Sequence, residues 1–200
     1  LKNIENNLSN LNISNLPKII AVSKTFKIDK ILPLIEHGHI HFGENKVQEA
    51  IDKWTEVKSK NANIKLHMIG KLQTNKVKFA VKLFDYIHSV DSEKLAKKIF
   101  EEQLKINKNI KIFIQVNIGN ENQKSGILKN NVLNLYSYCK KIGLSVVGLM
   151  CIPPFDNNSS LYFKEMKILN NELNFSELSM GMSSDYIEAS KHSATFLRIG

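Results

Sequence analysis

Short apolar runs alternate with helix-like segments along the chain, and this alternation constrains the fold more than any other feature. Eight runs have the length and residue types of strands, at residues 18–23, 39–43, 65–70, 86–90, 111–118, 145–150, 177–181 and 195–200. Helical periodicity predicts helices before and between them, at residues 4–11, 28–38, 45–59, 74–84, 92–106, 130–143, 159–173 and 183–193. Strands joined by helical crossovers run parallel, so the pattern predicts an α/β fold, a single (β/α)8 TIM-type barrel. An open doubly wound sheet is the alternative, because such barrels usually need about 250 residues.

Composition predicts one domain over residues 1–200. The chain has 200 residues and 42% hydrophobic content, which is enough for one core. No apolar run approaches the roughly 18 residues of a membrane span, and the first residues lack a secretory signal pattern. Cys139 and Cys151 lack metal-ligand spacing, so we interpret them as ordinary thiols of a reducing compartment. We therefore expect a cytoplasmic protein without a membrane partner; both ends, Leu1 and Gly200, look trimmed.

The basic charge does not predict nucleic-acid binding. The formal net charge is +9, but the lysines are spread over every helix-like segment and do not interleave with aromatic residues as a base-stacking surface requires. Arg198 is the one arginine among 28 basic residues. A lone arginine in a lysine-rich chain indicates a position that needs a planar, permanently charged group, although chance retention is the alternative.

A barrel would bring the residues at the carboxyl ends of its strands to one mouth. Those residues include Lys24, Asn45, Arg198 and Gly200. A lysine at the end of an apolar strand can be partly desolvated, which favours a neutral amine that attacks aldehydes; an ordinary surface lysine is the alternative.

The segment after the seventh strand has the features of an anion site. Ser183 precedes a helix expected to start near Ser184, where free N–H groups and the helix dipole would attract a phosphate. A routine helix start is the alternative. Together with the amine of Lys24 and the charge of Arg198, these groups are those needed to hold pyridoxal phosphate, which carries an aldehyde, a phosphate and a pyridine nitrogen.

A set of motifs in order resembles one known family. The motifs are AVSK, HFGENKVQEA, HMIGKLQTNK, QVNIGNENQKSG, GLMCIPP, and LSMGMSSDYIEA followed by RIG. They resemble the pyridoxal phosphate homeostasis proteins, single-domain relatives of the alanine racemase N-terminal barrel (fold type III). The resemblance covers nearly the whole chain.

The resemblance implies a set of cofactor-binding residues. It implies pyridoxal 5'-phosphate held as a Schiff base on Lys24, with Arg198 facing the pyridine nitrogen and keeping it unprotonated. It also implies that Ser183 and the backbone around Gly200 take the phosphate. Further residues implied near the cofactor are Asn45, at the ring, and Met180.

Two departures from the family pattern bear on this site. The family continues after RIG with a small hydroxyl residue and a short apolar stretch, so part of the phosphate site is expected to lie beyond Gly200. Ser193 or a neighbour replaces the glycine that usually precedes the final strand, which would alter the turn and leave the site intact.

Other polar residues have simpler interpretations. For His67 and His88, a satisfied, half-buried histidine is favoured over a catalytic one. Glu44 is expected either to orient Lys24 or Asn45, or to begin a helix favourably. Lys124 matches a family motif, but a solvated loop charge is the simpler explanation.

The resemblance implies a carrier rather than an enzyme. It implies control of free pyridoxal phosphate, with apo enzymes as possible acceptors, and we expect a monomer. Racemases of this barrel type take a second base, a tyrosine, from an additional β domain of a partner subunit, and one barrel uses all 200 residues here. A pyridoxal-phosphate-dependent racemase or lyase is the alternative. A basic nucleic-acid-binding protein is a more remote one.

Overall fold

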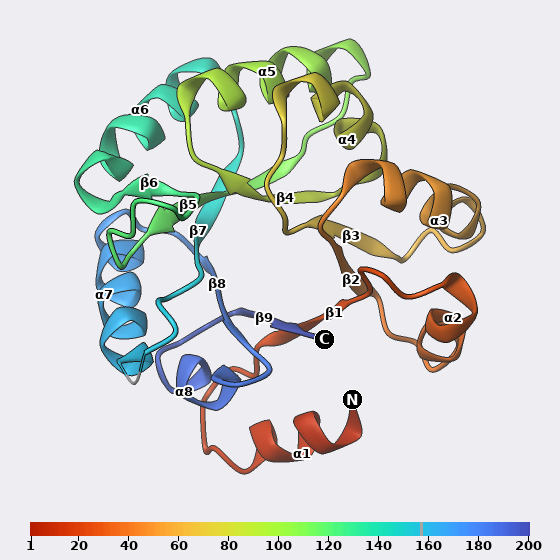
Figure 1. Cartoon of the computed structure of the whole chain (residues 1–200), viewed down its shortest axis with the longest axis horizontal. Helices are drawn as coiled ribbons and strands as arrows, with labels where there is room; N and C mark the ends of the chain where they lie inside the picture. The colour runs from red at the N-terminus through yellow and green to blue at the C-terminus, as the bar shows by residue number, and fades with distance from the viewer. Residues whose placement is uncertain (157) are drawn as a thin grey trace.

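Eight parallel strands close into a barrel inside a ring of helices in the computed structural model, which describes residues 1–156 and 158–200 (Figure 1). The barrel strands are β1 (Lys18–Val22), β2 (His41–Glu44), β3 (Lys65–Met68), β4 (Tyr86–Val90), β5 (Lys111–Asn117), β7 (Val146–Cys151), β8 (Glu177–Met182) and β9 (Phe196–Ile199). Their order is β4-β3-β2-β1-β9-β8-β7-β5, and the pairing of β4 with β5 closes the ring. The prediction of a (β/α)8 barrel is confirmed, and the open sheet is excluded.

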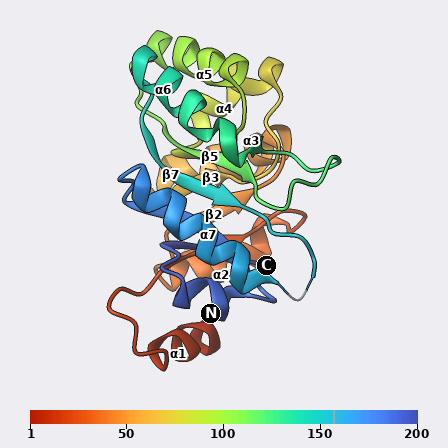
Figure 2. The same ribbon diagram turned by 90° about the vertical axis from the view of Figure 1, so that its left-hand side faces the viewer.

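Helices follow most strands and cover the outside of the barrel (Figure 2). They are α1 (Lys2–Ser9), α2 (Ile28–Glu36), α3 (Val47–Lys60), η1 (Thr74–Lys76), α4 (Val77–Leu83), α5 (Glu93–Lys105), η2 (Lys129–Asn131), α6 (Val132–Ile142), α7 (Ser159–Glu172) and α8 (Tyr186–Lys191). A two-residue strand, β6 (Ile127–Leu128), pairs with β5 and was not predicted. Within the described residues, no helix is long and apolar enough to span a bilayer.

Local signals place several of these elements. Ser92 caps α5, because its hydroxyl accepts a hydrogen bond from the Leu95 N–H at 3.3 Å. Ser193, which stands before β9, has a φ of 68°. This left-handed conformation favours glycine, so the structure explains why a glycine is suited to that turn.

Side chains alternate between two apolar layers along each strand. One layer fills the space between sheet and helices, and a smaller cluster lies inside the barrel: Ile20, Phe113, Met150 and Phe196. On β9, Phe196 belongs to the inner cluster and Leu197 to the outer layer. Because side chains alternate along a strand, Arg198 points to the inside of the barrel as Phe196 does. The same alternation determines which side chains at the other strand ends face the mouth.

The first and last barrel strands are neighbours. β1 pairs with β9 in parallel register, with Ile20 opposite Arg198 and Ala21 opposite Ile199. The carboxyl ends of both strands therefore lie side by side, although their residues are almost the full chain length apart.

Candidate functional site at the carboxyl end of the barrel

Lys24 lies in a turn directly after β1. The strand ends at Val22, and Lys24 follows two residues later with an exposed side chain. The expectation of a partly desolvated lysine is therefore wrong for this structure, because Lys24 lies beyond the strand and is exposed. The next residue, Thr25, has a φ of 66°, which is an uncommon conformation for a β-branched residue.

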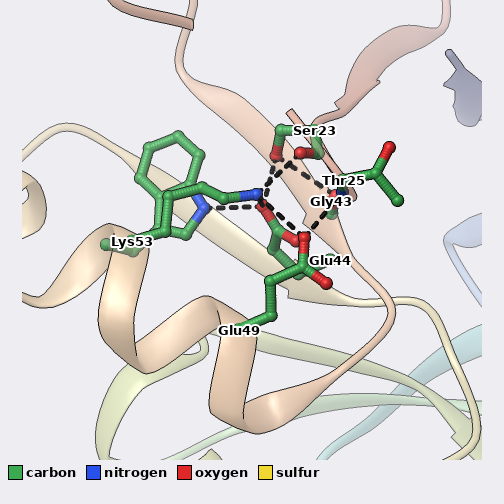
Figure 3. Close-up of polar contacts among 7 residues, drawn as sticks. Ser23, Thr25, Gly43, Glu44, Glu49 and Lys53 are labelled. Carbon is green, nitrogen blue, oxygen red and sulfur yellow. Dashed lines mark hydrogen bonds and ion pairs between the residues drawn. The ribbon is translucent and has the colours of Figure 1, made fainter. Parts of the chain in front are cut away.

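A buried ionic cluster lies beneath this turn (Figure 3). We name it the Glu44–Lys53 cluster; its members are Ser23, Glu44, Glu49, Lys53 and Trp54. One carboxylate oxygen of Glu44, Oε1, accepts hydrogen bonds from Ser23 Oγ at 2.7 Å, Trp54 Nε1 at 2.8 Å and Lys53 Nζ at 2.9 Å. The Glu44 side chain is fully buried and that of Lys53 is 8% exposed.

The cluster holds the backbone on both sides of Lys24. Lys53 Nζ donates to the Ser23 carbonyl at 2.8 Å and to Glu49 Oε1 at 3.3 Å. Glu49 Oε1 in turn accepts from the Thr25 N–H at 2.6 Å. Residues 23 and 25 are thus both fixed, and the strained φ of Thr25 is maintained by a charge-assisted hydrogen bond. Of the two alternatives for Glu44, the structure supports the orientation of the lysine turn.

Ser183 meets the last residue of the chain. Its hydroxyl donates to the Gly200 carbonyl at 3.2 Å and faces the Gly200 N–H at 3.3 Å. The helix expected to begin near Ser184 is present but begins two residues later, at Tyr186, because Asp185 Oδ1 accepts from the Met182 N–H at 2.6 Å and forms a turn there. The groups available for an anion here are a hydroxyl and backbone N–H groups, followed by a helix of only six residues.

Arg198 lies buried within the barrel near the carboxyl end of β9. Its side chain is 4% exposed; Nη1 donates to Ser179 Oγ and Nη2 to the Cys151 carbonyl, each at 2.8 Å. Burial lowers the pKa of the guanidinium. Within residues 1–156 and 158–200, no carboxylate forms an ion pair with it. A buried cation held by neutral acceptors alone is suited to a ligand with a hydrogen-bond acceptor or negative charge.

The other two predicted residues differ in placement. Asn45 follows β2 directly and is partly exposed at the mouth. Met180 is fully buried in the layer between sheet and helices, on the opposite side of β8 from Ser179, which contacts Arg198. Strand alternation therefore directs Met180 away from the mouth, and we omit it from the site.

Several secondary interpretations are corrected or refined. His67 and His88 are hydrogen-bonded as expected, but both are fully buried rather than half-buried.

Lys124 is an ion-paired residue rather than a solvated charge: it contacts Glu121 Oε2 at 2.6 Å and the Pro153 carbonyl at 3.2 Å. Burial raises the pKa of both cysteine thiols to about 12, as fits unreactive residues.

Fold and site together define the class of protein. The chain is an eight-stranded parallel barrel, and the profile of the alanine racemase N-terminal domain matches residues 1–200. The chain belongs to the family of pyridoxal phosphate homeostasis proteins. It is 36% identical to the protein of that name from Aquifex aeolicus, with 93% of this chain and 85% of the relative covered. The relative from Pasteurella multocida is 34% identical, with 92% of this chain and 83% of the relative covered.

Solved structures support the same assignment. The chain superimposes with a TM-score of 0.85 on PipY of Synechococcus elongatus PCC7942 with PLP bound; the two are 32% identical, and 98% of this chain and 97% of PipY are covered. Alanine racemase of Clostridium difficile 630 shares the fold with a TM-score of 0.75, at 16% identity over 55% of its own length. Its remaining length has no counterpart in this barrel.

Proposed function

We propose that residues 1–200 form one domain that binds pyridoxal phosphate at the mouth of the barrel and buffers or delivers it. The observation that carries the proposal is the meeting of Lys24 after β1 with Arg198 and Gly200 at the end of β9, because β1 and β9 are paired. The bound PLP in the PipY structure, which this chain matches over 98% of its length, supports the choice of ligand.

The donor set fits each part of the cofactor. Lys24 supplies a primary amine for the aldehyde, which would be held as a Schiff base with release of water. Ser183 and the Gly200 N–H, which are hydrogen-bonded to each other, are the groups proposed to take the phosphate. Arg198 supplies an N–H donor for the pyridine nitrogen, and Asn45 lies at the rim.

The proposed role is that of a carrier rather than a catalyst. When bound, pyridoxal phosphate supplies an electron sink for amino-acid chemistry, and an arginine at the pyridine nitrogen would weaken that sink by keeping it unprotonated. Tyr86 begins β4 at its amino end, away from the mouth, and the other tyrosines lie on helices, namely Tyr136, Tyr138, Tyr162 and Tyr186.

Exposure of the binding groups supports exchange of the ligand with other proteins. Lys24, Ser183 and Gly200 are all exposed. A cofactor held there would remain accessible from one side, so apo enzymes are the proposed acceptors. We also propose that the chain acts as a cytoplasmic monomer.

Trapping the bound cofactor tests this proposal. Borohydride reduction of the chain mixed with pyridoxal phosphate should attach one label, and peptide mass analysis should place it on Lys24. Lys27, three residues away and also exposed, serves as an internal control for nonspecific labelling. Labelling spread over many lysines would contradict a specific site. If the protein converted an amino acid and lost this activity on removal of Lys24, the carrier hypothesis would be wrong and a racemase or lyase would take its place.

Loss of the Ser183 hydroxyl should weaken binding without preventing it. A hydrogen bond to a charged group contributes about 1.5–3 kcal/mol, so Ser183→Ala should raise the dissociation constant for pyridoxal phosphate at least about tenfold. Ser184→Ala, at the adjacent exposed residue, is the matched control and should bind as the unchanged chain does. The measurement is an absorbance titration of each variant; equal affinities in both would exclude Ser183 from the phosphate site.

A further inference from the structure

A continuous hydrogen-bonded chain crosses the inside of the barrel to Arg198. We name it the histidine chain; its members are His41, His67, His88 and Ser179. His41 Nδ1 lies 3.0 Å from His67 Nε2, His67 Nδ1 lies 2.8 Å from His88 Nε2, and His88 Nδ1 lies 2.9 Å from Ser179 Oγ. Arg198 Nη1 completes the series with its 2.8 Å bond to Ser179 Oγ.

The two ends of the histidine chain face opposite ends of the barrel. His41 is the first residue of β2 and lines a surface hollow of about 470 Å³. Arg198 is next to the last residue of β9, at the mouth. The chain therefore connects the amino-terminal end of the barrel with the proposed cofactor site.

The interior keeps these histidines neutral and fixed. His67 stacks on Tyr86 with ring centres 4.3 Å apart, and His88 stacks on Phe113 at 4.2 Å. Burial lowers the pKa of His67 and His88 well below the usual value and that of His41 to about 4. Each ring then carries one N–H, so each has one donor and one acceptor nitrogen.

Arginine at one end determines the direction of every bond. The Arg198 guanidinium only donates, so Ser179 Oγ accepts from it. If His88 Nδ1 also donated to Ser179, the hydroxyl proton would be left buried without an acceptor among the described residues, at a cost of about 1–3 kcal/mol. Ser179 therefore donates to His88 Nδ1. It follows that His88 Nε2–H donates to His67 Nδ1, and His67 Nε2–H donates to His41 Nδ1.

We propose that the histidine chain has this single polarity and thereby positions Arg198 for the ring of the cofactor. Because the Ser179 proton is directed at His88, the oxygen's lone pairs face Arg198 and hold its guanidinium without an opposite charge. His67 and His88 are positioning residues that act through Ser179. The part of the proposal that concerns the cofactor rests on the function proposed above.

The polarity is testable on the full chain without cofactor. Nitrogen-15 NMR of the imidazole rings should show Nε2 protonated and Nδ1 unprotonated in His41, His67 and His88. His39 is an internal reference for a protonated Nε2, because that atom lies 2.9 Å from the His41 carbonyl, which can only accept. A proton on Nδ1 of any of the three histidines would overturn the assigned direction.

The positioning role is testable through the single arginine of the chain. His67→Phe keeps an aromatic ring against Tyr86 but breaks the chain two links from Arg198. The Arg198 Nε–H signal, which is unambiguous because the chain has no other arginine, should shift in this variant. Tyr86→Phe keeps the stacking and alters no link, so it is the matched control and should leave that signal in place. An unchanged Arg198 signal in a folded His67→Phe variant would overturn the positioning role.

A binding measurement separates the two proposals. His67→Phe removes two hydrogen bonds, to His41 and to His88. The loss of the bond to His88, which lies on the Arg198 side, should weaken pyridoxal phosphate binding about fivefold, or about 1 kcal/mol for one net hydrogen bond. If the unchanged protein does not bind pyridoxal phosphate, the proposed function fails while the NMR results still decide the polarity. If it binds and His67→Phe binds equally well, the positioning role fails alone. If His67→Phe does not fold, the imidazole tautomers of the unchanged protein still test the proposed direction of the hydrogen bonds.

Discussion

Lys24→Ala should abolish the saturable absorbance band that pyridoxal phosphate gives with this protein. The band requires a primary amine next to the aldehyde, and alanine has none. Although the chain contains many other lysines, Lys24 alone follows β1 beside the end of β9, so no other amine is expected to replace it. Absorbance titration of the variant, before and after borohydride, measures the effect.

Lys27→Ala is the control for this experiment. Lys27 lies on the same exposed connection between β1 and α2, and its loss changes the net charge by the same amount. It should bind as the unchanged chain does. If Lys24→Ala retained a reducible band of equal affinity, another lysine would hold the aldehyde and the assignment of Lys24 would be wrong.

Glu44→Met should destabilise the protein by about 3–5 kcal/mol, the usual cost of removing one partner of a buried ion pair. The variant leaves the Lys53 ammonium, 8% exposed, with only the more distant Glu49 as a charged partner. It also removes the acceptor of Trp54 Nε1 and of Ser23 Oγ. Urea denaturation measures the free energy of unfolding.

A surface ion pair on α3, the helix that carries Lys53, provides the control. Glu56 and Lys60 form an ion pair on α3 with both side chains mostly exposed, so Glu56→Met should cost less than about 1 kcal/mol. Adding Lys53→Met to Glu44→Met should restore part of the stability, since the uncompensated charge is then gone. If Glu44→Met cost no more than Glu56→Met, the cluster would not hold the Lys24 turn in place.

Periodicity in the sequence predicted the strands and helices of the barrel but left an open doubly wound sheet as the alternative. Runs such as residues 86–90 and 111–118 became strands within a residue or two of their expected bounds, because a parallel strand buried on both faces is continuously apolar. The start of α8 could not be predicted in the same way. It depends on a hydrogen bond between Asp185 and the Met182 N–H, and serines before it mimic a cap.

The proposed cofactor groups were identifiable, but their supporting residues were not. Lys24 and Arg198 stood out by position and by rarity. The Glu44–Lys53 cluster was missed because it joins a strand to a helix through packing that no local pattern encodes. The histidine chain left a signal that was not used: His41, His67 and His88 come from three consecutive strands, and their shared inward parity would have placed them together.

The pairing of β1 with β9 has a kinetic consequence. It joins residues 18–21 to 196–199, so this strand pairing is among the most distant in the chain and carries a large loop-closure entropy cost. The groups proposed to hold pyridoxal phosphate meet across this same seam. Before β9 pairs with β1 the site is therefore incomplete, and ligand bound afterwards stabilises the closed ring by mass action. The concentration of pyridoxal phosphate would then determine how often the pairing of β1 with β9 opens.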